Sequence, residues 1–147
     1  MSKFRYRMQS ILDIKLKMET LAKQDFAAAM TKLNDEERKL EGLKARKLGY
    51  EQEARRLLSD TLSVQDIQEN NNAIARLEEF IEEQKEQVEA ARRNLERERE
   101  KLAEAMKERK VHENLKEKEF EEFIQEENKS ENLVTDELTS YRYGQKE

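Results

Sequence analysis

The chain has 147 residues, of which 43% are charged, 35% hydrophobic and 6% aromatic, and its formal net charge is −5. It contains no Pro, Cys or Trp and a single His, so disulfide frameworks, thiolate metal sites and cysteine nucleophiles are excluded. The apolar content is too low for a compact domain of this length, and no apolar run approaches the ~20 residues that a membrane span needs, which leaves a charged coiled coil or a disordered chain.

The first predicted helix covers about residues 4–58, and no proline interrupts it. Its apolar residues recur every seven positions in two runs, the first being Phe4, Ile11 and Met18 and the second Phe26, Leu33 and Leu40. The step from Met18 to Phe26 is one residue longer than a heptad. The pattern therefore predicts a discontinuity that locally unwinds the supercoil.

A turn is predicted at about residues 59–66, the only cluster of small turn-forming residues between the two periodic segments. Ser63 is followed three residues later by Asp66, a pair that resembles a capping box and indicates the start of a second helix. This second helix is expected at about residues 64–127.

The second helix has the more regular pattern, with apolar side chains at Ile67, Ile74, Ile81, Val88, Leu95 and Leu102. A disordered chain would not keep this phase, so the periodicity predicts a coiled-coil seam, the row of side chains that faces a partner helix. Further along the same seam lie Arg109, His112 and Lys116. These polar positions predict a weaker stretch.

Neither helix can bury its apolar stripe alone, and a short turn makes the two helices antiparallel neighbours. Bases predominate in residues 1–24 and acids in residues 117–137, and a turn near Leu62 brings these segments together. We therefore expect an all-α fold, a long antiparallel two-helix coiled-coil hairpin over residues 1–127. Residues 128–147 have no partner helix and are predicted to form a flexible or fraying tail.

No group of residues suggests catalysis, because the carboxylates are spread over solvated helices without a pocket to shift a pKa. We predict no enzyme activity, no cofactor and no metal site, since His112 lacks neighbouring ligands. The start of the chain interleaves bases with aromatic residues, namely Lys3, Phe4, Arg5, Tyr6 and Arg7. Nucleic acid is one partner for such a segment, but the acidic net charge favours docking on a protein. No membrane insertion is expected.

Residues 4–13, Phe-Arg-Tyr-Arg-Met-Gln-Ser-Ile-Leu-Asp, resemble the N-terminus of the FliJ family, small coiled-coil proteins of the bacterial flagellar export apparatus. Residues 74–81, just after the turn, are also similar to that family. The resemblance implies a non-enzymatic stalk whose paired helix ends stimulate a hexameric export ATPase, and which also binds the cytoplasmic domain of the export-gate membrane protein. Some members escort export chaperones.

The resemblance also implies site residues, a cytoplasmic position at the inner face of the membrane beneath the flagellum, and a part in motility and chemotaxis. The ATPase contact falls on residues 3–7. The positions that match the family's export-gate contact are Ala73, Leu77, Phe80 and Gln84. Leu43 and Tyr50, on the facing stretch of the first helix, are candidates to extend this patch. For Phe80 the alternative is packing over the seam. Two alternatives remain for the whole protein, a coiled-coil stalk or chaperone-type protein of another type III secretion machine and a structural spacer.

Overall fold

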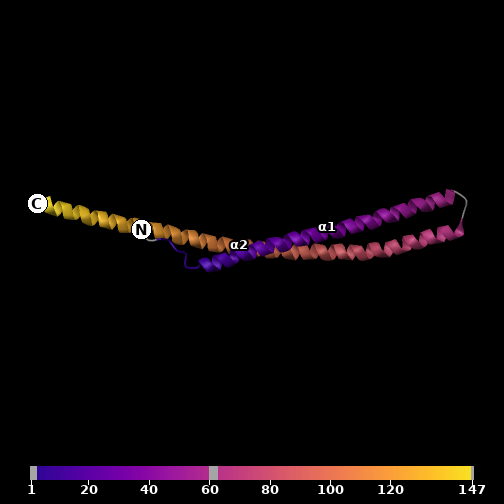
Figure 1. The fold of residues 1–147 in the computed structure, drawn as a ribbon, viewed down its shortest axis with the longest axis horizontal. Helices are drawn as coiled ribbons and strands as arrows, with labels where there is room; N and C mark the ends of the chain where they lie inside the picture. The colour runs from indigo at the N-terminus through magenta and orange to yellow at the C-terminus, as the bar shows by residue number, and fades with distance from the viewer. Residues whose placement is uncertain (1–2, 60–62, 147) are drawn as a thin grey trace. The chain divides into compact units, whose positions relative to one another are not determined.

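The computed structural model describes residues 3–59 and 63–146, with side chains described as far as residue 144. This part of the chain contains two helices, α1 (Gln9–Ser59) and α2 (Val64–Lys146), and the described residues contain no strand (Figure 1). The predicted all-α fold of two long helices packed against each other is therefore confirmed. Two compact units can be distinguished along these helices.

The first unit, here called the turn-side unit, comprises Leu21–Leu102. Its two helix segments are antiparallel, because Asn70 near the start of α2 bonds to Tyr50 late in α1, while Gln84 further along α2 bonds to Glu36 earlier in α1. The seam of α2 lies where the heptads predicted it, with Leu77, Ile81, Val88 and Ala91 buried. Apolar burial of this kind is the main source of stability in a coiled coil.

The beginning of α2 is fixed by Ser63, as the capping pattern predicted. The Ser63 hydroxyl accepts a hydrogen bond from the Asp66 backbone N–H at 3.3 Å, and the Ser63 carbonyl accepts one from the Ile67 N–H at 3.1 Å. These bonds satisfy a free donor and start the helical ladder. The remaining turn residues, 60–62, lie outside the described residues.

The second unit, here called the terminal unit, comprises Met1–Thr20 and Ala103–Glu147. Helix α1 begins at Gln9, later than the predicted start near Phe4. The preceding residues form a turn closed by hydrogen bonds from the Gln9 N–H to the Tyr6 carbonyl at 3.1 Å and from the Ile11 N–H to the Met8 carbonyl at 3.0 Å. The aromatic side chains of Phe4 and Tyr6 pack inward from this non-helical segment.

The predicted discontinuity between Met18 and Phe26 is wrong. Leu12, Glu19, Phe26 and Leu33 turn away from solvent and follow one another every seven residues, so the heptad repeat of α1 is unbroken there. Ile11 and Met18, which were expected in the seam, are 37% and 47% exposed. Glu19 can occupy this seam position because its carboxylate is paired with Arg109 of α2. The heptad repeat therefore continues through a charged residue, although apolar residues were expected in the seam.

Helix α2 does not end near residue 127 but continues to Lys146. All side chains described in residues 128–144 are exposed. Fraying of this segment stays a prediction.

Candidate partner-binding surfaces

The residues expected at the export-gate contact differ in exposure. Leu77 is 4% exposed and forms part of the seam, whereas Phe80 is 51% exposed and Tyr50 is 38% exposed. Leu43, Ala73 and Gln84 are half-buried. Phe80 and Tyr50 are therefore the most exposed members of this set.

The members of this set lie in two rows, one on each helix. Ala73 and Phe80 are seven residues apart on α2, so they share one face of that helix. Leu43 and Tyr50 continue the heptad of the buried residues Ala29 and Glu36, so they belong to the seam row of α1. That the two rows form one contact with a partner stays a prediction.

Gln84 is engaged within the fold. Its side-chain amide donates hydrogen bonds to the backbone carbonyl of Glu36, at 2.9 Å, and to the Glu36 carboxylate. Lys32 forms an ion pair with the same carboxylate at 2.9 Å. The hydrogen bond from Lys32, followed by that from Gln84, lowers the pKa of Glu36 to about 2. Gln84 therefore holds the register of the two helices, a role that sequence reasoning missed.

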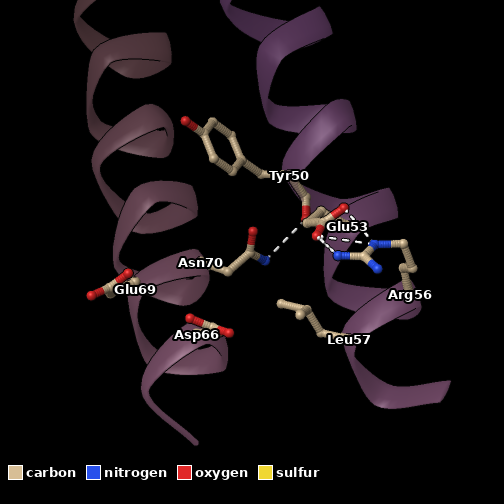
Figure 2. Close-up of a pocket in the computed structure, with 7 residues that line it drawn as sticks. All are labelled: Tyr50, Glu53, Arg56, Leu57, Asp66, Glu69 and Asn70. Atoms are coloured by element: carbon tan, nitrogen blue, oxygen red, sulfur yellow. Dashed lines mark hydrogen bonds and ion pairs between the residues drawn. The ribbon is translucent and has the colours of Figure 1, made fainter. Parts of the chain in front are cut away.

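Around Tyr50 the two helices enclose an open cleft of about 400 Å³, shown in Figure 2 and lined by Tyr50, Glu53, Arg56, Leu57, Asp66, Glu69 and Asn70. The Asn70 amide donates a hydrogen bond of 3.0 Å to the Tyr50 carbonyl, and Arg56 pairs with Glu53 at 2.6 Å. The hydrogen bond from Arg56 lowers the pKa of Glu53. The lining of the cleft is mostly polar, and the Tyr50 ring lies beside the cleft.

The basic residues at the start of the chain point outward while the aromatic ones anchor the segment. Phe4 packs against Phe120 and Phe123, with ring centroids 5.1 Å and 5.5 Å away. Tyr6 is buried at 6% exposure. The alternating residues Lys3, Arg5 and Arg7 are all exposed. The alternation of basic and aromatic residues therefore holds three positive charges on the surface of the terminal unit.

Among the residues that the structure describes, no cluster of His, Cys, Asp and Glu side chains could hold a metal ion. Within the same part of the chain, neither helix has an apolar stretch long enough to cross a membrane.

Comparison with known proteins identifies a family and a fold. The family model described as flagellar FliJ protein matches residues 4–147. A solved structure from Chlamydia trachomatis, described as a YscO homolog, CT670, superposes with a TM-score of 0.73 at 23% sequence identity, covering 96% of each chain. This similarity supports the two-helix fold. No curated protein matches the chain significantly.

Proposed function

We propose that this chain, which belongs to the FliJ family of flagellar proteins, is a non-enzymatic stalk and adaptor of the flagellar protein export apparatus. In this role it stimulates the hexameric export ATPase and links it to the cytoplasmic domain of the export gate. It acts in the cytoplasm, at the inner face of the cell membrane at the flagellar base. The observation that carries the proposal is the family match over residues 4–147 on two long packed helices.

The terminal unit supports the ATPase contact. Lys3, Arg5 and Arg7 are exposed positive charges on a segment held in place by Phe4 between two aromatic rings. A fixed cluster of one charge sign steers a complementary surface and gives salt-dependent association. If the stalk binds the assembled ring but not its free subunits, mass action shifts the ATPase toward the ring.

The ATPase contact is tested by replacing Lys3, Arg5 and Arg7 together with Glu and measuring stimulation of the purified export ATPase at several salt concentrations. We expect stimulation to fall by about tenfold or more, the effect of weakening a contact by about 1.4 kcal/mol. The matched control replaces Arg76, Arg93 and Arg97, which are exposed in the turn-side unit, and changes the net charge equally. Equal stimulation by both triple variants would remove residues 3–7 from the contact.

The gate contact rests on Phe80, whose ring is 51% exposed beside the seam. Aromatic side chains are over-represented among interface anchors, and truncating such an anchor often costs ~2 kcal/mol of binding free energy. Because Leu77 is buried in the seam, Leu77→Ala would damage folding and binding together. Phe80→Ala changes an exposed side chain, so it separates an effect on binding from an effect on folding.

The measurement is calorimetric titration of the Phe80→Ala variant with the gate's cytoplasmic domain, and circular dichroism melting of the same sample. We expect the affinity to fall at least tenfold while the melting temperature stays unchanged. Leu48→Ala, at an apolar position with 53% exposure, is the control and should keep wild-type affinity. A large loss of stability with unchanged affinity would show that Phe80 is a packing residue.

A further inference from the structure

Residues 3–7, here called the basic segment, precede α1 in the terminal unit and are not helical. Burial alternates along the segment, with the three basic side chains exposed and the aromatic residues Phe4 and Tyr6 turned away from solvent. An alternation of period two is the pattern of an extended backbone, in which every second side chain lies on the same side. The bases therefore share the outer side of the segment.

The non-helical backbone decides where these charges point. In an α-helix, residues two positions apart lie about 200° apart around the axis. The helix that the sequence predicts from Phe4 would therefore place Arg5 and Arg7 on opposite sides. In the observed conformation both are exposed next to inward-facing rings. A change of the basic segment to helix or to disordered chain would scatter its charges.

The Phe4 ring ties the basic segment to α2. Its centroid lies 5.1 Å from that of Phe120, at an interplanar angle of 69°, and 5.5 Å from that of Phe123. Aromatic pairs at such distances are favourable beyond the area that they bury. Tyr6 adds a second inward ring, whose buried hydroxyl has no hydrogen-bond partner among the described residues. Ring packing, together with the turn that leads into α1, therefore holds the segment on the terminal unit.

This packing matters for binding because it orders the basic segment in advance. A short non-helical segment is poorly ordered unless something ties it down. A partner that binds a disordered segment must also order it, and this lowers the affinity of the complex. With Phe4 packed on α2, the partner meets bases that are already on one side.

We infer that Phe4 acts in the ATPase contact as a positioning residue, which presents the three bases without touching the ATPase itself. Phe120 and Phe123, here called the seat, then belong to the same site although they lie on the other helix. The inference rests on the function proposed above. It differs from a direct contact of Phe4 in one consequence, namely that removing the seat should have the same effect as removing Phe4.

The seat is tested first, without the ATPase. The chain contains no Trp, so Phe4→Trp introduces a single indole whose fluorescence reports on its surroundings. We expect acrylamide to quench this fluorescence several times faster when Phe120 and Phe123 are both replaced by Ala, here called the seat variant. Ile14→Ala, at a position of the same unit with 56% exposure, is the control and should leave quenching unchanged. Equal quenching with and without the seat would overturn the inference.

The second test measures stimulation of the purified export ATPase over a range of concentrations of the full chain. Phe4→Ala keeps all three bases, but the complex must now order the segment. Fixing the backbone of a single residue corresponds to about a tenfold factor in affinity. We therefore expect the concentration for half-maximal stimulation to rise about tenfold or more and maximal stimulation to stay unchanged. Phe4→Trp and Ile14→Ala should keep the wild-type value.

The seat variant should show the same rise as Phe4→Ala. Combining the two should add nothing, because both remove one contact. Additive effects, or a rise with Phe4→Ala alone, would overturn the inference, since Phe4 would then touch the ATPase directly. A large loss of helicity by circular dichroism in either variant would also overturn it, because the rings would then hold the fold and not only the segment.

The charge-reversal variant of Lys3, Arg5 and Arg7 separates this inference from the contact on which it rests. If that variant stimulates the ATPase as the wild type does, the contact is wrong and the positioning role falls with it. If it loses stimulation while Phe4→Ala keeps the wild-type response, the contact stands and only the positioning role is overturned.

Discussion

Gln84 of α2 reaches across the seam to Glu36 of α1 and donates to both its backbone carbonyl and its carboxylate. Glu36 itself is 4% exposed and is surrounded by donors, since Lys32 and Lys39 also reach its carboxylate. A buried polar contact between two helices fixes their register, because any slip would leave both groups without partners. Together with the hydrogen bond from Asn70 to the Tyr50 carbonyl, this contact aligns the seam of the turn-side unit.

The Glu36 carboxylate makes stability depend on pH. The pKa of Glu36 is lowered to about 2 by hydrogen bonds from Lys32 and then Gln84, whereas in the unfolded chain it is about 4.3. A lowered folded pKa contributes stability that is complete above the unfolded value and is lost as pH falls toward the folded value. The relevant window therefore lies between about pH 4.5 and about pH 2.

We expect Glu36→Gln to flatten the dependence of melting temperature on pH in this window, because the substituted side chain does not titrate. Circular dichroism melts of the wild type and the variant at several pH values measure the difference. Glu83→Gln, at an exposed position, serves as the control and should keep the wild-type slope. Identical slopes for the wild type and Glu36→Gln would show that this contact contributes no acid sensitivity.

The pairing of Glu19 with Arg109 is expected to affect stability asymmetrically. The Arg109 and Glu19 side chains are only 19% and 7% exposed, and the pKa of Arg109 is raised by its hydrogen bond to Glu19. Removing one member of a buried ion pair leaves a charge poorly solvated, while replacing both by apolar residues is often neutral or stabilising. Arg109→Leu should therefore lower the melting temperature.

The double variant Glu19→Leu, Arg109→Leu should recover or exceed the wild-type melting temperature, because Leu at both seam positions restores the apolar pattern of the heptad. Thermal melts of the two single variants and the double variant form a cycle that isolates the coupling between these residues. A double variant less stable than either single one would contradict this account.

How far the sequence predicts this structure depends on the segment. Ile81 and Val88 were assigned to the seam correctly because the seam of α2 in the turn-side unit is mostly apolar and burial alone decides its phase. In the first turns of α1 the same rule selected Ile11 and Met18, which are exposed. The phase there depends on pairing of charges between helices. Continuing the heptad backward from Phe26 reaches Glu19, and this signal was present in the sequence.

The candidate contacts, too, could be predicted from the sequence only in part. The exposed position of Phe80 beside the seam follows from helix periodicity, so the sequence predicts it. The engagement of Gln84 does not follow, because its partner Glu36 lies 48 residues away in the chain and no local pattern links them. Likewise, the inward packing of Phe4 depends on Phe120 and Phe123 of the other helix.

The glycines in α1 offer a test of whether a partner approaches the helix backbone closely. A methyl group added at Gly42 or Gly49 would meet no atom within 4 Å beyond the adjoining backbone of its own helix. Ala is about 1 kcal/mol more favourable than Gly within a helix, so Gly42→Ala and Gly49→Ala should each raise the free energy of unfolding by about that amount. Urea denaturation measures the gain. A destabilised variant would contradict the open surroundings, and a stabilised variant with weaker ATPase or gate binding would indicate that a partner requires the glycine.

The end of α2 provides the last test, because all described side chains of residues 128–144 are exposed even though the segment is helical. Helices without tertiary packing are marginal in water, so this segment should fray and be cleaved first in limited proteolysis. Deleting residues 128–147 should leave the melting temperature within about 1 °C of the wild type, because almost no buried apolar area is lost. Mass spectrometry of the fragments locates the cuts, and thermal melts compare the truncated and full chains. If residues 128–144 resisted protease as well as residues 74–102 do, or if the deletion lowered the melting temperature clearly, the end of α2 would have to be packed against another part of the protein.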